Sequence, residues 1–365
     1  MREKKKKVQE PVKLKIPDPS RLDRVSTINA EVAKQLATSE KLSKITTLDL
    51  EDSPIGDEGL AALLASPHLK TILRLYLTNT KISDEACSVL AQATSLKGLQ
   101  ELRLSSNQLS AKGLRVLLSS PNLKHLEALH LEESSIGDEG AEVLGAASLP
   151  ALRSLSLQWC QLNAPGALAL SRGVWAKHLS QLSVSHNTLA DAGVESFCKG
   201  AFSSIERLSL GWTSSSDASL AALAASPWPS LSYLDLRGNP LSDAGAEALA
   251  KSSNLQKLSA LKLRFTSISS KGEKSLLRGL PSLRVLDLAP LAAEVLVVCS
   301  YCRSKTPEVA TRCGACDRDV TEGQTTELAL SAYKAQHRVT CHHCGAQRFE
   351  ESLLCPTCRR WGQPL

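Results

Sequence analysis

The sequence predicts an α/β solenoid, in which short parallel strands alternate with helices, followed by a small β module built around metal ions. Three observations predict this fold class. A pattern of 26 to 27 residues recurs along the middle of the chain, aromatic residues make up only 4% of its 365 residues, and eight of the eleven cysteines lie near its C-terminal end. Scarce aromatics favour a core of leucine and alanine, which suits stacked repeats better than a single compact core.

Residues 1–20 are expected to form a disordered basic arm. Residues 1–15 hold seven Lys or Arg and two Glu, which is +5 of the formal net charge of +6. Such a run among prolines is typical of solvated chain; the alternative is loose attraction to an acidic surface or a nucleic acid. The arm lacks the apolar stretch of a signal peptide, and no apolar run reaches the roughly 18 residues of a membrane-spanning helix. We therefore expect a cytoplasmic protein without a membrane contact.

A capping helix is expected within residues 21–44, and repeats are expected over residues 45–290. The pattern apolar-x-x-Leu-x-Leu-x-x-(Asn/Thr/Ser/Cys)-x-apolar occurs in nine full copies and one half-copy, with first positions at Ile45, Ile72, Leu99, Leu126, Leu152, Leu179, Ile205, Leu231, Leu258 and Leu283. Alternation around the leucines predicts a strand, and the apolar spacing after the turn predicts a helix. Because a helix joins each strand to the next, the strands must be parallel.

Each helix is expected to begin at a residue that caps helices well, with a small residue three positions later. The candidate caps are Gly56, Ser83, Ser110, Gly137, Asn163, Ala190, Ser216, Ser242 and Ser269. Only Ala190 is not a preferred cap type. The small residue, such as Gly113 or Gly166, is expected to let the helix approach the sheet closely.

The copies resemble leucine-rich repeats of the ribonuclease-inhibitor-like class, as in Ile55-Gly-Asp-Glu-Gly59 and Ile136-Gly-Asp-Glu-Gly140, with Leu63 and Leu144 following. The resemblance covers about residues 25–290. It implies a curved α/β horseshoe with the parallel sheet concave and the helices convex. It also implies a protein-binding role, although a fold alone does not assign a function.

The concave face is expected to hold the residues between and just after the buried leucines of each strand. Acidic residues occur in its first half, as at Glu51 and Glu132, and basic residues occur later. Of the 13 aromatic residues, five fall on this face. The expected partner-binding residues are Tyr76, Trp159, His186, Trp212, Tyr233, Arg237, Lys262, Arg264 and Phe265. Exposed Trp and Tyr beside Arg are typical of interaction hot spots. The alternative is that Trp159 and Trp212 pack on each other or on loop edges, with His186 a simple polar surface residue.

Residues 296–365 contain two cysteine quartets with the same spacing. The first is Cys299, Cys302, Cys313 and Cys316, and the second is Cys341, Cys344, Cys355 and Cys358. Two Cys-x-x-Cys turns present four thiolates, which suit a tetrahedral Zn²⁺ site. Since no ligand position is left for water, we expect two structural zinc ions. Pairing within each quartet is favoured; a cross-brace between the quartets and a rubredoxin-like iron site are the alternatives.

This segment also resembles the tandem zinc ribbon family, through Cys313-Gly-Ala-Cys316, Cys341-His-His-Cys344-Gly and Cys355-Pro-Thr-Cys358. The resemblance implies tandem zinc ribbons over residues 296–365, each with four cysteine ligands. Each site of four thiolates and one zinc ion adds −2, so two sites lower the formal charge of the chain from +6 to +2. The remaining cysteines, Cys87, Cys160 and Cys198, fall on interior repeat positions and are expected to be small buried residues in a reducing compartment.

These observations favour a non-enzymatic scaffold or adaptor that captures a protein partner on the concave surface and uses its zinc ribbons as a second interaction module. The alternative is a nucleic-acid- or polymerase-associated factor that acts through the ribbons, and its binding would weaken steeply with salt. An enzyme is disfavoured, because the sequence has no phosphate loop and no hydrolase elbow. It also has no His/Cys/Asp constellation outside the repeat and zinc positions.

Overall fold

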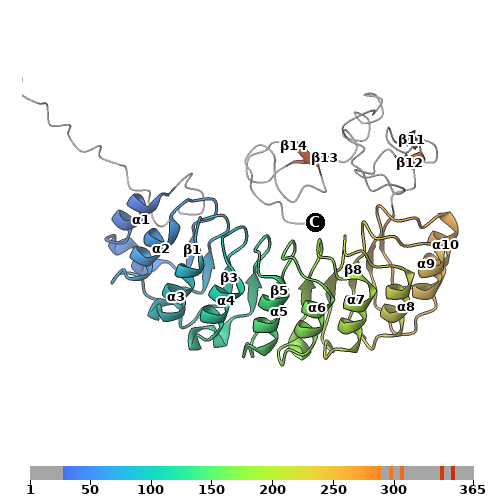
Figure 1. Cartoon of the computed structure of the whole chain (residues 1–365), viewed down its shortest axis with the longest axis horizontal. Helices are drawn as coiled ribbons and strands as arrows, with labels where there is room; N and C mark the ends of the chain where they lie inside the picture. Colours follow the sequence, from blue (N-terminus) through green and yellow to red (C-terminus); the bar gives the residue numbers. More distant parts are fainter. Residues whose placement is uncertain (1–27, 289–295, 299–304, 308–337, 341–346, 350–365) are drawn as a thin grey trace, which may run out of the picture. The chain divides into compact units, whose positions relative to one another are not determined.

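The computed structural model describes residues 28–288, 296–298, 305–307, 338–340 and 347–349 (Figure 1). The chain divides into two compact units, which are treated separately below. Unit 1 comprises Met1–Ser209 with Ser226–Leu231, and unit 2 comprises Leu210–Ala225 with Ser232–Leu365. The predicted basic arm and all eight C-terminal cysteines lie outside the described residues.

Seven short strands of unit 1 pair in parallel and in chain order, as predicted. They are β1 (Thr47–Asp49), β2 (Arg74–Tyr76), β3 (Glu101–Arg103), β4 (Ala128–His130), β5 (Ser154–Ser156), β6 (Gln181–Ser183) and β7 (Arg207–Ser209). Leucines occupy the middle of each strand at one register position, so that Leu48 pairs with Leu75 and Leu75 with Leu102. These leucines are fully buried, whereas the residues on either side of them are mostly half-buried or exposed.

The helices of unit 1 lie in one row along one side of its strands (Figure 1). The α-helices are α1 (Ala30–Leu36), α2 (Gly56–Leu64), α3 (Asp84–Gln92), α4 (Ala111–Leu118), α5 (Gly137–Ala146), α6 (Ala164–Ser171) and α7 (Ala190–Lys199). Short 3-10 helices precede several strands: η2 (Glu40–Lys44), η3 (Thr94–Leu96), η4 (Pro121–His125) and η5 (Ala176–His178). The opposite side of the strands, with the turns that follow them, is named the strand face.

Unit 2 continues the alternation with α8 (Asp217–Ala225), β8 (Tyr233–Asp235), α9 (Asp243–Ala250), β9 (Ala260–Lys262), α10 (Ser270–Gly279) and β10 (Val285–Asp287). Strands β8, β9 and β10 pair in parallel. Two antiparallel hairpins follow, formed by β11 (Leu296–Val298) with β12 (Lys305–Pro307) and by β13 (Arg338–Thr340) with β14 (Gln347–Phe349).

Buried asparagines tie neighbouring repeats together where the chain turns out of the sheet. The Asn107 side chain donates to the carbonyl oxygens of Leu77 (2.6 Å) and Leu104 (2.9 Å). Its Oδ1 accepts the backbone N–H groups of Thr80 (3.0 Å) and Ile82 (3.3 Å). Asn187 in unit 1 and Asn239 in unit 2 repeat this arrangement. Where the repeat pattern has asparagine at this position, its side chain is therefore a bridge between repeats, since a buried backbone group without a partner is costly.

Most of the expected helix caps are confirmed, but three are wrong. Ser83, Ser110, Ser242 and Ser269 each have an extended backbone and accept a backbone N–H with the side chain. Gly56, Gly137 and Ala190 are instead the first residues of their helices, at φ values of 60°, 58° and 51°. Their caps are Ile55, Ile136 and Leu189. The left-handed backbone explains the two glycines, because glycine adopts it without a steric penalty.

After several caps the small residue lies against a carboxylate of the preceding repeat, which the sequence did not predict. Asp138 accepts the backbone N–H of Asn163 (2.8 Å) and of Gly166 (3.1 Å) in the next repeat. Asp84 likewise accepts the backbone N–H of Ser110 (2.8 Å). A Cβ atom added to Gly113 or Gly166 would collide with these carboxylates. Gly113 and Gly166 therefore make room for a carboxylate of the preceding repeat, whereas Gly140 and Gly193 lie against the cap residues Ile136 and Leu189.

Replacing Ala190 with glycine is expected to stabilise unit 1 by about 1 kcal/mol, because alanine is strained at positive φ. Ala192→Gly is the matched control in the same helix, where glycine is expected to cost about 1 kcal/mol. Urea unfolding of both variants measures the difference. Equal destabilisation by both would contradict the strain at Ala190.

Candidate functional site on the strand face

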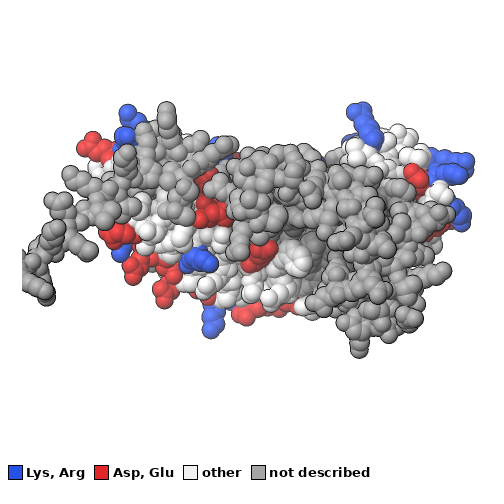
Figure 2. Space-filling model, turned by 90° about the horizontal axis from the view of Figure 1, so that it is seen from above, with Lys and Arg blue, Asp and Glu red and all other residues white. Residues whose placement is uncertain are grey.

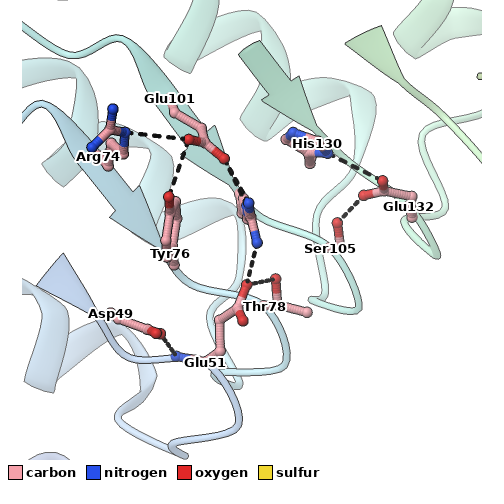
Figure 3. A network of polar contacts seen from close by, with 10 residues as sticks. Asp49, Glu51, Arg74, Tyr76, Thr78, Glu101, Ser105, His130 and Glu132 are labelled. Atoms are coloured by element: carbon pink, nitrogen blue, oxygen red, sulfur yellow. Dashed lines mark hydrogen bonds and ion pairs between the residues drawn. The ribbon is translucent and has the colours of Figure 1, made fainter. Parts of the chain in front are cut away.

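A network of polar side chains covers the strand face over β1 to β4 (Figure 3). Glu101 is at its centre. Its carboxylate accepts hydrogen bonds from the Tyr76 hydroxyl (3.1 Å) and from Arg103 Nε (2.9 Å), and lies 3.6 Å from Arg74 Nε. The Arg103 guanidinium also lies 4.2 Å from the centre of the Tyr76 ring. Tyr76 is therefore held between strands, and it is only partly exposed.

Two further carboxylates belong to this network. Glu51 accepts a hydrogen bond from Thr78 Oγ1 (3.0 Å) and lies 3.6 Å from Arg103. Burial raises the pKa of Glu51, and the charge of Arg103 only partly opposes that rise. Burial also acts to raise the pKa of Glu132, but hydrogen bonds from His130, Ser105 and Ser156 together with attraction to His130 lower it. The Glu132 carboxylate lies 3.3 Å from His130 Nδ1.

Carboxylates exceed cations on this part of the strand face. Strands β1 to β4 and the three residues after each strand hold two arginines, Arg74 and Arg103. They hold six carboxylates: Asp49, Glu51, Asp52, Glu101, Glu132 and Glu133. The sum of six negative and two positive charges is −4, with histidine neutral. In Figure 2, acidic side chains gather over the visible part of the left half of the molecule, with few basic ones among them.

One position after each strand has a left-handed backbone. In unit 1 the φ values range from 54° to 59° at Asp52, Asn79, Ser106, Glu133, Trp159 and His186. Side chains at this position interact in pairs across neighbouring repeats. Asn79 donates to Asp52 (3.0 Å), Ser106 donates to Glu133 (2.9 Å), and Trp159 stacks on His186.

The Trp159–His186 pair is the main exposed aromatic feature of this face. The ring centres lie 4.1 Å apart and the ring planes differ by 10°. Trp159 is still 49% exposed, and His186 is half-buried. The sequence placed both residues on this face but did not predict that they stack.

Unit 2 has its own aromatic pair at the equivalent position. Trp212 is 43% exposed, and its ring centre lies 5.7 Å from that of Phe265. Gly238 occupies the repeat between them, and a Cβ atom there would collide with the indole ring. The absence of a side chain at Gly238 therefore lets Trp212 lie across it toward Phe265.

The other expected residues of unit 2 are less available than the sequence indicates. Tyr233 is buried, at 9% exposure, and Lys262 Nζ lies 5.8 Å from its ring centre. Arg237 binds both carboxylate oxygens of Asp235 (Nε to Oδ1 3.0 Å, Nη2 to Oδ2 2.8 Å), and Arg264 pairs with Asp287. Arg237 and Arg264 are therefore neutralised by ion pairs within unit 2.

Arg74 and Glu101 belong to the network but were not among the expected site residues. The signal was present in the sequence, because both residues directly precede the middle leucine of a strand. In a strand, residues on either side of a buried position share the opposite face. Their pairing, however, depends on the register of neighbouring strands.

The expected zinc ligands lie outside the described residues, but the strands around them are described. Cys299 and Cys302 fall in the connection between β11 and β12, and Cys341 and Cys344 fall in that between β13 and β14. Within residues 296–365, strands β13 and β14 and the second cysteine quartet each follow their counterparts in the first half by 42 residues, as in 338 − 296 and 341 − 299. Among the described residues, no group of three or more His, Cys, Asp or Glu is placed to hold a metal ion.

The three cysteines of the repeats are poor nucleophiles. Burial raises the pKa of the Cys87 and Cys160 thiols to about 12 and that of Cys198 to about 11. Such thiols remain protonated near neutral pH, which makes them unreactive. Cys87 and Cys160 are buried as expected, whereas Cys198 is half-buried.

Comparison with known families identifies the repeats. A family model described as Leucine Rich repeat matches residues 41–64, 99–118, 122–145, 149–171, 176–198 and 229–250. Residues 41–250 contain leucine-rich repeats. The leucine-rich repeats alternate strand and helix in the matched segments, and the unmatched β2 and α3 follow the same order. A search of curated proteins found no match to this chain.

Leucine-rich repeats generally mediate interactions between proteins and typically act as non-enzymatic scaffolds. The surface of the repeats is therefore the one to consider for a protein partner. Within the described ranges, no helix has the length and apolar character needed to cross a membrane.

Proposed function

We propose that this chain is a non-enzymatic scaffold that captures a protein partner on the strand face of its leucine-rich repeats. The observation that carries the proposal is the exposed Trp159 ring. Trp159 adopts a φ of 57°, which is uncommon for a bulky residue, and leaves half of its side-chain surface in water. Neither burial nor backbone preference accounts for tryptophan at this position, whereas binding a partner does.

The surroundings of Trp159 support an interaction hot spot. Tryptophan is enriched among the residues that contribute most to protein–protein affinity, and these residues are surrounded by contacts that add little energy but exclude water. His186 fixes the indole plane by stacking on it. A ring held in one orientation loses less conformational freedom on binding, which favours affinity.

Trp212 and Arg237 extend the proposal to unit 2. The indole of Trp212 is exposed and rests against Phe265 across Gly238. Arg237 is held by Asp235, so its remaining N–H groups have a fixed direction. Aromatic rings next to an oriented arginine are suited to contact with a protein surface.

The test is affinity capture with the full chain and three variants, Trp159→Ala, Trp212→Ala and Arg237→Ala. Captured proteins are identified by mass spectrometry. Each tryptophan variant is expected to weaken partner binding at least about ten-fold without unfolding the repeats. Val174→Ala is the control, since Val174 is 68% exposed but lies in the connection after α6. Full retention of binding in all three variants would reject the strand face as the binding surface.

We also propose that residues 296–365 form tandem zinc ribbons, each with one structural Zn²⁺ bound by four cysteines, which serve as a second interaction module. The 42-residue repeat of hairpin and cysteines supports this, because both halves set a Cys-x-x-Cys pair between two antiparallel strands. A reducing cytoplasm would keep these thiols available for metal. The alternation of helix and strand similarly supports membership of the ribonuclease-inhibitor-like class of repeats.

A further inference from the structure

The chemistry of the unit 1 strand face indicates what kind of partner it binds, provided that the proposed scaffold function holds. The face carries six carboxylates and two arginines over β1 to β4. Three of the six carboxylates have an internal cationic or histidine partner: Glu51 has Arg103, Glu101 has Arg74 and Arg103, and Glu132 has His130. The net charge of −4 nevertheless remains to be balanced from outside.

Glu133 is the carboxylate that lies next to the exposed tryptophan. Its described contacts are a hydrogen bond from Ser106 (2.9 Å) and repulsion from Glu132, without an ion pair to a described Lys, Arg or His. Burial and the charge of Glu132 raise the pKa of Glu133. An added cation would stabilise the charged form of this carboxylate.

Glu133, Trp159 and His186 hold the same position in three consecutive repeats. All three have a left-handed backbone, and the N–H groups of Glu133 and Trp159 each donate to the next repeat, to the carbonyls of Gln158 (2.9 Å) and Ser185 (3.3 Å). His186 covers one face of the Trp159 indole. The other face is therefore turned to the side of the preceding repeat, where Glu133 lies.

An indole face beside a carboxylate is suited to a cationic side chain. Lysine and arginine bind over tryptophan faces within about 6 Å of the ring centre. Neighbouring strands are about 4.8 Å apart, so a cation over the open indole face is also close to the Glu133 carboxylate. Hydrophobic and acidic side chains would lack one or both of these interactions.

We propose that the unit 1 strand face binds a basic, lysine- or arginine-rich segment of a partner protein, and that one cationic side chain of this segment lies between Trp159 and Glu133. Five strands, β1 to β5, span about 19 Å, which an extended segment of about six residues crosses. Four cations on such a segment would balance the −4 of the face. Charge complementarity of this kind raises association rates and excludes acidic partners.

The experiment measures binding of a fluorescein-labelled peptide of alternating Lys and Ser, about eight residues long, to the full chain by fluorescence anisotropy. Peptides with Glu or Gln in place of Lys serve as comparisons. The lysine peptide is expected to bind, and more weakly at about 200 mM salt than at about 50 mM. The glutamate peptide is expected not to bind.

Two pairs of variants locate the cation. Glu133→Gln is expected to weaken lysine-peptide binding roughly three-fold, and Trp159→Ala about ten-fold. Glu139→Gln is the matched control, because it removes the same charge from an exposed residue of α5 and is expected to change affinity by less than about 1.5-fold. Trp159→Phe, which keeps an aromatic face, is expected to retain more affinity than Trp159→Ala.

Three outcomes would overturn the proposal: equal binding of the glutamate peptide, equal effects of Glu133→Gln and Glu139→Gln, or tighter lysine-peptide binding by the K4Q/K5Q/K6Q/K7Q variant. The last outcome would assign the face to the chain's own basic residues. Loss of this proposal alone would leave Trp159-dependent capture of a partner intact. Failure of the scaffold function would instead abolish the Trp159 dependence in both assays.

Discussion

Replacing Asn107 with alanine is expected to destabilise the leucine-rich repeats by about 3 kcal/mol or more, which is among the largest effects of a single substitution in unit 1. Alanine would leave the buried Leu104 carbonyl and the buried N–H groups of Thr80 and Ile82 without their partner, in two different repeats. The Leu77 carbonyl would keep its hydrogen bond from Thr80 Oγ1. Each such group costs about 1 to 3 kcal/mol when it is left unsatisfied. Urea unfolding followed by circular dichroism measures the loss.

Asn79→Gly provides the matched control for this experiment, because glycine adopts the φ of 54° at this position without the steric penalty that alanine would carry. Asn79 lies in the neighbouring repeat, is half-buried, and donates its side-chain hydrogen bond to the partly exposed Asp52. Its removal is expected to cost less than about 1 kcal/mol. Similar losses for both asparagines would show that the bridge between repeats contributes little.

Removal of zinc is expected to unfold residues 296–365 and to leave the leucine-rich repeats folded. Structural zinc contributes on the order of 10 kcal/mol to the folding of a small site of this kind. The purified chain should contain two zinc ions by plasma mass spectrometry, and a chelator should remove them without lowering the helical circular dichroism signal. Iron in place of zinc, or fewer than two ions, would contradict the proposed sites.

Cysteine variants decide how the quartets pair. In the double variant Cys299→Ser/Cys313→Ser, pairing within each quartet predicts the loss of one zinc ion. In a cross-brace, one site takes Cys299 and Cys341 and the other takes Cys313, so the same double variant loses both ions. Cys299→Ser/Cys341→Ser then gives the reverse result: both ions are lost with pairing within each quartet, and one is lost with a cross-brace. Cys87→Ala, which removes a buried thiol of the repeats, is expected to keep two ions.

The strands and their order could be predicted because leucine spacing determines which residues are buried. A strand with Leu75 or Leu102 at its centre has one inward position, and the identical repeat length places these leucines in register. Helix starts were harder to predict. Gly56 and Ser83 occupy equivalent positions, yet Gly56 has a left-handed backbone and Ser83 an extended one, and so the helix begins one residue earlier at Gly56.

The sequence predicted which residues lie on the strand face better than it predicted how exposed their side chains are. Trp159 and Trp212 are exposed as expected, whereas Tyr233 is buried. The pairing of Arg237 with Asp235 was accessible to sequence reasoning, since residues two apart in a strand share a face. The pairing of Arg264 with Asp287 was not, because it joins neighbouring strands. Stacking of Trp159 on His186 likewise depends on side-chain orientation across repeats.

The carboxylates that reach from one repeat to the cap of the next determine where this chain can be cut and rejoined. Asp84 supports Ser110, and Asp243 supports Ser269, so the start of each of these helices depends on a residue 26 positions earlier. A duplicated or transplanted block would fold cleanly only if its first cap met an aspartate at the junction. Recombination at these junctions is therefore constrained by pairs of residues that straddle the splice point, rather than by the leucines alone.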